Sequence, residues 1–96
     1  MRLLFIVFEA SVENRVVAML ERCGAPGYTR FAGATGDGKH GPREGTPVWP
    51  GLNNLILAGM PEEIVPMVVE SLQKLEDERG GRLAVKVFSV PADEYL

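Results

Sequence analysis

The 96-residue chain has a single cysteine, Cys23, and a single histidine, His40. One cysteine excludes an internal disulfide framework and suits a reducing compartment, so we expect a cytoplasmic protein. The apolar run at residues 3–8 is too short for a signal-peptide core or a membrane span, which predicts no direct membrane insertion. Acidic residues outnumber basic residues, 13 to 10, so the formal net charge is −3. This charge argues against binding to nucleic acid or to a membrane surface.

Short apolar segments with turn residues between them predict four β-strands. The first segment is apolar on both side-chain parities, which is typical of a strand buried on both faces. The third segment resumes an apolar strand after a long glycine-rich stretch. The four predicted strands are residues 3–8, 27–32, 52–60 and 82–90.

Two amphipathic segments predict helices, one after the first strand and one after the third. Ser11 is placed to cap the first helix, and Gly24 stands where a left-handed residue would end it. Pro61 is expected at the first position of the second helix, and the glycines at residues 80–81 would end it. Pro66 lies about one turn inside that helix, which predicts a late start or a kink.

The resulting order, strand–helix–strand–strand–helix–strand, predicts one domain over residues 1–96 with an α+β ferredoxin-like sandwich. Right-handed crossovers place the first and third strands in the middle of a four-stranded antiparallel sheet, with both helices on one face. Since the central strands are apolar on both faces, the uncovered face needs a partner surface. We therefore expect a homo-oligomer.

Residues 33–51 are rich in glycine and proline and have neither helical nor strand periodicity. Their start nearly matches the phosphate-binding P-loop pattern G-x-x-x-x-G-K-[S/T], with His40 in place of the hydroxyl residue. A P-loop passes its phosphate to the N-terminus of a following helix. Gly41 and Pro42 do not allow a helix to begin there, which excludes a P-loop nucleoside triphosphatase.

A segment of this length is usually functional or disordered when it lies in a compact domain. Glycine backbone N–H groups can form a nest for an anion, and Lys39, Arg43 and Arg30 would add positive charge beside it. Trp49 stands between two prolines. We favour its anchoring the loop against the body or a neighbouring subunit over its stacking on a ligand.

The order of elements, with a long loop between the second and third strands, resembles the PII signalling family and its PII-like relatives. Residues 36–39, Gly-Asp-Gly-Lys, resemble the G-x-G-[R/K] motif at the root of the PII T-loop. Residues 27–29, Gly-Tyr-Thr, resemble the G-x-T that enters strand two. Residues 80–82, Gly-Gly-Arg, stand at the place of the B-loop motif G-x-G-K. The run GTPVWPG is more similar to a PII-like subgroup with a short T-loop.

This resemblance implies a homotrimer that senses a small-molecule effector, most plausibly an adenine nucleotide, in clefts between subunits. Residues 33–51 would be the T-loop equivalent, which engages a regulated protein such as a membrane transporter. Carried over by motif, the ligand would meet Gly36, Gly38 and Lys39 of one chain and Gly81 and Arg82 of its neighbour.

The partner-binding part of the loop would include His40, Arg43 and Trp49. The sequence lacks the tyrosine region that PII proteins use for covalent modification and the C-terminal arginines that assist ATP binding. A weaker nucleotide preference, or a different anion, is therefore an open alternative.

A metal site is the runner-up interpretation, because CutA proteins, implicated in metal tolerance, share the trimeric fold plan. His40 is the weak candidate ligand, with Asp37, Glu44 and Cys23 as its possible companions. No ligand set has a known spacing within one chain. A third alternative is an interaction module whose loop only docks the oligomer.

We do not expect an enzyme. Acylphosphatase, a ferredoxin-like enzyme of similar size, has a glycine-rich arginine loop after its first strand, where this chain has Glu9-Ala-Ser-Val12. No serine or paired-carboxylate arrangement elsewhere suggests catalysis, and Cys23 has no histidine next to it in the sequence.

Overall fold

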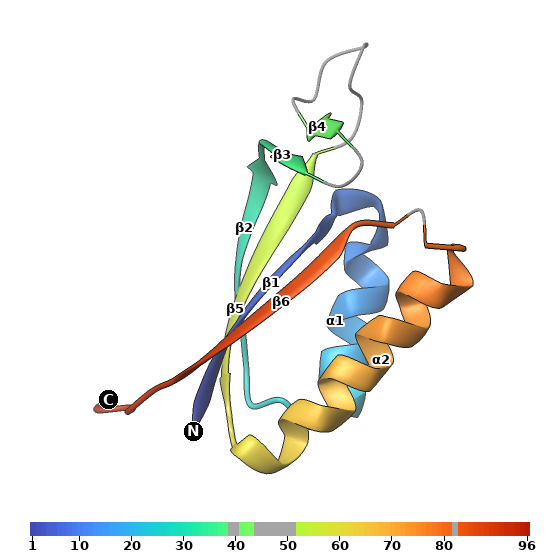
Figure 1. Cartoon of the computed structure of the whole chain (residues 1–96). Helices are drawn as coiled ribbons and strands as arrows, with labels where there is room; N and C mark the ends of the chain where they lie inside the picture. Colours follow the sequence, from blue (N-terminus) through green and yellow to red (C-terminus); the bar gives the residue numbers. More distant parts are fainter. Residues whose placement is uncertain (39–40, 44–51, 82) are drawn as a thin grey trace.

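The computed structural model describes residues 1–38, 41–43, 52–81 and 83–96. Within them, a four-stranded antiparallel sheet has the order β2-β5-β1-β6, and two α-helices cover one of its faces (Figure 1). This confirms the predicted ferredoxin-like α+β architecture, with the first and third long strands in the middle. The elements of the sandwich are β1 (Arg2–Glu9), α1 (Glu13–Arg22), β2 (Thr29–Ala34), β5 (Asn53–Met60), α2 (Val65–Glu78) and β6 (Val85–Pro91).

The core lies between the helices and the face of the sheet that they cover. Along β1 every second side chain points into it, and Leu4, Ile6 and Phe8 are completely buried. Partners in the register, such as Ile56 opposite Ile6, continue the same face across β5. Completely or almost completely buried side chains from the helical layer fill the other side, namely Val12, Val16, Leu20, Val68 and Leu72.

The start of α1 differs from the prediction. A short 3-10 helix, η1 (Ala10–Val12), precedes it, and no side chain caps either of the two. The Ser11 hydroxyl donates a hydrogen bond to Glu9 Oε1 at 2.9 Å, so it turns back toward the strand and does not accept from the helix N–H groups. The Ser11 cap was therefore a wrong prediction.

The predicted end of α1 at Gly24 is confirmed. Gly24 has φ 80°, its N–H donates to the Glu21 carbonyl at 3.1 Å, and the Ala25 N–H donates to the Leu20 carbonyl at 3.0 Å. These paired bonds form a Schellman motif. Gly80 and Gly81 end α2 in the same way, with φ values of 63° and 74°.

The start of α2 confirms the late start predicted at Pro66. Residues Glu62–Ile64 form a 3-10 helix, η2, and α2 begins only at Val65, so that Pro66 falls in its first turn. A proline is tolerated there because the missing N–H would have no partner within the helix. Pro61 precedes η2, so its prediction as the first residue of the helix was wrong.

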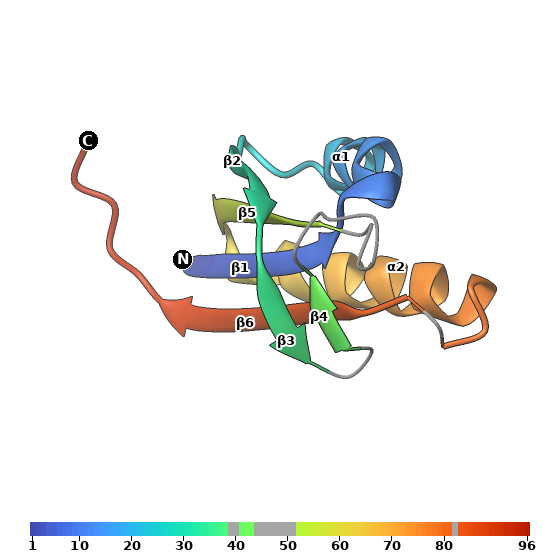
Figure 2. The ribbon, with the colours of Figure 1, turned by 90° about the horizontal axis from the view of Figure 1, so that it is seen from above.

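The bounds of the two edge strands also differ from the prediction. β2 extends past 32 to Ala34 because a bulge between Phe31 and Ala34 lengthens it, and β6 begins only at Val85. The segment 33–51, predicted without strands, contains a two-stranded hairpin of β3 (Gly36–Gly38) and β4 (Gly41–Arg43). Seen from above, this hairpin lies across the end of the sheet (Figure 2).

The other face of the sheet carries apolar side chains that neither α1 nor α2 covers. Its centre is Phe5, which lies opposite Leu57 on β5 and opposite Phe88 on β6. Phe88 is 60% exposed. The register adds further apolar members to this uncovered face, namely Leu3, Val7, Phe31, Leu55 and Val90. No helix in the described part of the chain is long and apolar enough to cross a membrane.

Candidate functional site

Two of the predicted ligand-binding glycines, Gly36 and Gly38, lie in the β3–β4 hairpin, which stands beyond the ends of β1 and β2 and the start of β5 (Figure 1). Gly36 is opposite Arg43 and Gly38 is opposite Gly41, so the two short strands hold each other in an extended arrangement. Lys39 and His40, which join the two strands, lie outside the described residues. The structure thus brings Gly36 and Gly38 together at one end of the molecule.

The entry to this hairpin is held by a glycine with unusual backbone geometry. Gly33 has φ 73°, in the left-handed region that favours glycine, and it lies within the bulge of β2. Its N–H donates a hydrogen bond of 3.1 Å to Asn54 Oδ1. The bulge therefore turns the chain out of the sheet at a fixed residue.

Asn54 connects this bulge to the helical layer. It is only 4% exposed, and its Nδ2 donates to Glu13 Oε1 at 2.6 Å. Arg30 Nη1 lies 3.3 Å from each oxygen of the same carboxylate. We call Glu13, Arg30, Gly33 and Asn54 the Asn54 network. Both the Oδ1 and the Nδ2 atom of the buried Asn54 have hydrogen-bonding partners, which is the condition for keeping a polar group in a core.

The Asn54 network changes the interpretation of Arg30. The sequence suggested that Arg30 adds positive charge beside the loop, but the structure places it on the helix-covered face of β2, paired with Glu13. Its charge is thus balanced by the start of α1. Arg30 supports the base of the loop rather than offering an open anion contact.

The exit of the loop is fixed by the backbone. The Ala10 N–H, at the start of η1, donates to the Leu52 carbonyl at 2.8 Å. The segment that begins at Gly33 and ends at Leu52 is therefore tied to the body at both ends. Such a scaffold is typical of loops that carry function, since a rigid base positions what the loop presents.

The second predicted half of the site lies elsewhere in the chain. Gly81 follows α2, and its N–H donates to the Glu76 carbonyl at 3.2 Å. Both ribbon views place this turn on the α2 side of the molecule, apart from β3 (Figures 1 and 2). Arg82 lies outside the described residues. One chain therefore does not bring Gly36 and Gly81 together, and a site that uses both needs two chains.

The structure separates the residues proposed for a metal site. Cys23 is buried beyond the far end of α1, where its Sγ lies 3.9 Å from Ser71 Oγ, whereas Asp37 belongs to β3. Among the described residues, no group of three or more histidine, cysteine, aspartate or glutamate side chains could hold a metal ion. Glu44, like His40, lies outside them. Of the residues predicted to bind a partner, Arg43 ends β4, and Trp49 is also outside the described part.

Sequence reasoning missed the roles of Glu13 and Asn54. A signal was present for Asn54, because it shares the side-chain parity of Ile56, Ala58 and Met60, which all face the core. A polar residue on a buried parity must find a hydrogen-bonding partner. Glu13 carried no comparable signal, since an acidic residue early in a helix is common on stability grounds alone.

Comparison with known proteins bears on the same region. The model of the family "Nitrogen regulatory protein P-II" matches residues 1–95. The chain belongs to the nitrogen regulatory protein P-II family. This confirms the PII-like resemblance, and it identifies the β3–β4 hairpin as part of a PII fold. No match was found among curated proteins.

Solved structures of PII-like proteins share the fold. CPII from Thiomonas intermedia K12, bound to ADP, AMP and bicarbonate, has a TM-score of 0.74 and 27% identity, covering 93% of this chain and 84% of CPII. The apo form of CPII has a TM-score of 0.67 and 25% identity, with coverages of 93% and 87%. A PII-like signalling protein from Thermus thermophilus has a TM-score of 0.62 and 30% identity, with coverages of 93% and 82%.

Proposed function

We propose that this PII-family chain is a cytoplasmic regulatory protein, rather than an enzyme, that senses a small anionic ligand at clefts between subunits. The observation that carries the proposal is the family match over residues 1–95, together with CPII structures that hold ADP, AMP and bicarbonate. Binding shifts the order of the T-loop equivalent, residues 33–51 of the single domain, which engages or releases a partner protein such as a membrane transporter. A ligand can shift the equilibrium between two loop conformations only to the extent that it binds one conformation more tightly than the other.

The oligomer in this proposal is a homotrimer. Its support is the uncovered face of the sheet, where apolar side chains such as Phe5, Leu57 and Phe88 form a continuous surface. An apolar surface of this kind marks an interaction site, and a symmetric copy of the same chain offers a matching one. Assembly would also bring the hairpin of one chain near the α2–β6 turn of another.

The ligand is an adenine nucleotide. Its phosphates meet the backbone of Gly36 and Gly38 and the ammonium group of Lys39, with Gly81 and Arg82 contributed by the neighbouring chain. Glycine backbone donors and a fork-shaped guanidinium both suit phosphate oxygens.

Bicarbonate belongs in the test because CPII structures contain it together with nucleotides. It carries charge on oxygen atoms, as a phosphate does, but it offers no base for stacking. An effect of bicarbonate on nucleotide affinity would make the protein a sensor of two ligands, and the coupling would be reciprocal.

Calorimetric titration of the purified protein with ADP, AMP and ATP, each with and without bicarbonate, tests the proposal. We expect saturable binding at one site per chain, weakened about tenfold or more by Lys39→Ala, since a charge-assisted contact contributes roughly 1.5–3 kcal/mol. Lys86→Ala is the matched control, because Lys86 lies in β6, outside the proposed ligand contacts. Lys86 is on the uncovered face, opposite Val7, so this variant must first be shown to keep the mass of the wild type. Absence of heat with all three nucleotides, or equal losses in the two lysine variants, would overturn the nucleotide proposal.

A further inference from the structure

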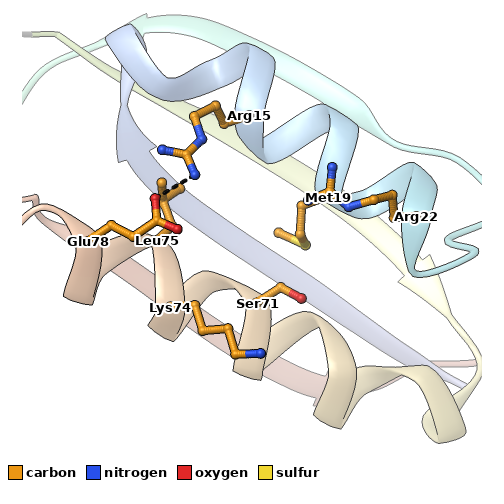
Figure 3. A pocket seen from close by; sticks show the side chains of 7 residues that line it. All are labelled: Arg15, Met19, Arg22, Ser71, Lys74, Leu75 and Glu78. Carbon is orange, nitrogen blue, oxygen red and sulfur yellow. Dashed lines mark hydrogen bonds and ion pairs between the residues drawn. The ribbon is translucent and has the colours of Figure 1, made fainter.

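A groove on the outer side of the two helices carries an unusual set of side chains. It has a volume of about 240 Å³ and lies between α1 and α2, on the side of the helices away from the sheet (Figure 3). Its lining residues are Arg15, Met19 and Arg22 from α1 and Ser71, Lys74, Leu75 and Glu78 from α2.

Helical periodicity explains why these residues meet. On α1 the lining residues are spaced by four and three positions, and on α2 by three, one and three, so each set forms one stripe of its helix. The two helices run antiparallel, because Arg15 at the start of α1 pairs with Glu78 at the end of α2, while Cys23 lies near Ser71. The stripes therefore face each other along the groove.

The floor of the groove is apolar and its rim is cationic. Met19 and Leu75 are only 4% and 6% exposed, and Figure 3 shows Met19 pointing from α1 toward α2. Three cationic side chains and one carboxylate line the groove, in a chain whose formal net charge is −3. The side chains that line the groove thus carry a net positive charge, whereas the net charge of the whole chain is negative.

The three cationic side chains of the groove differ in their ion pairs. Arg15 Nη2 lies 2.6 Å from Glu78 Oε2, which closes one end of the groove, and Lys74 is 3.5 Å from Glu70. Arg22 makes no ion pair within the part of the chain that the structure describes. Within the described residues, the contact recorded for the Ser71 hydroxyl is a long one, 3.9 Å to Cys23 Sγ. At the open end, Arg22 therefore has no carboxylate partner among the described residues, and Lys74 has only the long contact to Glu70.

We infer that this groove binds a small organic oxyanion, a carboxylate or a phosphate monoester with a short carbon skeleton. The anionic group accepts hydrogen bonds from Arg22, Lys74 and the Ser71 hydroxyl, and the carbon skeleton packs on Met19 and Leu75. The volume is below the ~300–1,000 Å³ of sites for drug-sized ligands, which favours a small molecule. A planar guanidinium with an ammonium opposite suits either oxyanion.

This site is separate from the one under Proposed function. It uses no residue of the segment 33–51, and it lies in the helical layer, on the opposite side from the uncovered face of the sheet (Figure 1). Assembly through the uncovered face would therefore leave the groove open to solvent. Binding in the groove and binding at the loop can succeed or fail independently.

The test is an amide NMR titration of the whole protein with inorganic phosphate, and separately with succinate and glycerol phosphate, at constant ionic strength. We expect saturable shifts for amides in residues 15–22 and 71–78. Arg22→Gln should weaken binding about tenfold or more, which corresponds to ~1.4 kcal/mol or more, and Arg22→Lys should restore part of it. Lys74→Gln, which removes a cation from the opposite helix, should weaken binding as well. Tighter binding of succinate identifies a carboxylate ligand, and tighter binding of glycerol phosphate identifies a phosphate monoester.

Arg79→Gln is the matched control, because it removes the same charge from a residue beyond the end of α2 that does not line the groove. Equal weakening by Arg22→Gln and Arg79→Gln would reduce the effect to a general ion atmosphere and overturn the site. If neither helix shows saturable amide shifts, the proposed groove site is also overturned. Shifts confined to residues 36–43 would assign the anion to the loop instead, which leaves the proposed function standing without the groove.

Discussion

The two faces of the four-stranded sheet are built from alternate residues of the same strands, yet they have different surroundings. Along β1, Leu4, Ile6 and Phe8 point toward the helices and are completely buried. Phe5 and its neighbours on the other face are apolar too, but no helix of the described chain covers them. The comparison shows that the period of a strand assigns side chains to a face, whereas helix placement decides which face is buried within the chain.

Polar residues differ between the faces as well. Asn54 lies on the covered face, where its Oδ1 accepts from the Gly33 N–H and its Nδ2 donates to Glu13. Its neighbour Asn53, opposite Glu9 on the other parity, has a buried Oδ1 atom without a hydrogen-bonding partner in the described part of the chain. Of these two neighbouring asparagines, the one on the covered face is thus matched by other described residues, whereas the Oδ1 atom of the other is not.

Truncation of a core residue on the covered face should have the largest effect. Phe8→Ala removes a completely buried ring beside the start of the helical layer. We expect the free energy of unfolding to fall by about 3–5 kcal/mol, from lost burial and the cavity left behind. Urea denaturation at a fixed protein concentration measures it, because assembly adds to the apparent stability. A loss below about 1 kcal/mol would contradict the assignment of Phe8 to the core.

A charge placed on the uncovered face should break assembly rather than folding. Phe88→Glu puts a carboxylate on this face, on the edge strand β6 and opposite the central Phe5. We expect the mass in solution to fall to that of one chain, with the circular dichroism of the fold retained, since burying an unpaired charge is strongly unfavourable. Light scattering measures the mass.

Val69→Glu is the matched control for assembly. Val69 is also an exposed apolar residue, at 44%, but it lies on α2. The variant should keep the mass of the wild type. If both variants dissociate, or neither does, the uncovered face is not the interface between subunits.

Loss of the Asn54 side chain should have an intermediate effect. Asn54→Ala leaves the Gly33 N–H and the Glu13 carboxylate without their partner, and we expect a loss of about 1–3 kcal/mol in unfolding free energy. Asn53→Ala should cost less, because the Asn53 Oδ1 atom has no hydrogen bond to lose among the described residues. Thermal denaturation of the pair shows the difference. Hydrogen exchange should also accelerate at Gly33 in Asn54→Ala alone; equal behaviour of the two variants would refute the role of the network.

Removal of the Arg30 side chain should have the smallest effect. The Arg30–Glu13 ion pair is partly exposed, with the Arg30 side chain at 47%, so solvent screens most of the attraction. We expect Arg30→Ala to lower the unfolding free energy by about 0.2–1 kcal/mol, and by less at high salt. Denaturation at two salt concentrations measures this. A loss as large as that of Asn54→Ala would mean that Arg30 organises the loop base by itself.

Sequence reasoning succeeded where one local rule acts alone. Gly24, Gly80 and Gly81 end helices because few other residues adopt a left-handed backbone, and Pro66 delays α2 because proline lacks an N–H group. It failed where two partners compete for one group. Ser11 was a good cap by type, but its hydroxyl found Glu9 instead.

Only part of the candidate site could be predicted from the sequence. The spacing of Gly36 and Gly38 pointed to the family, and the family model agrees over residues 1–95. The β3–β4 pairing had no signal, because glycine and proline have low strand propensity and the hairpin forms through backbone register. Arg30 was assigned to the loop on charge, although the parity of β2 places it beside α1.

The sequence by itself determined the order of the elements, the apolar parities of the central strands and the glycine-rich motif, because these depend on residue type and spacing along the chain. Only the tertiary structure decided that Asn54 and Glu13 anchor the loop base, and that Arg22 and Lys74 line one groove. The members of each pair lie far apart in the sequence. Their proximity depends on how the crossovers pack the helices on the sheet, which no local pattern encodes.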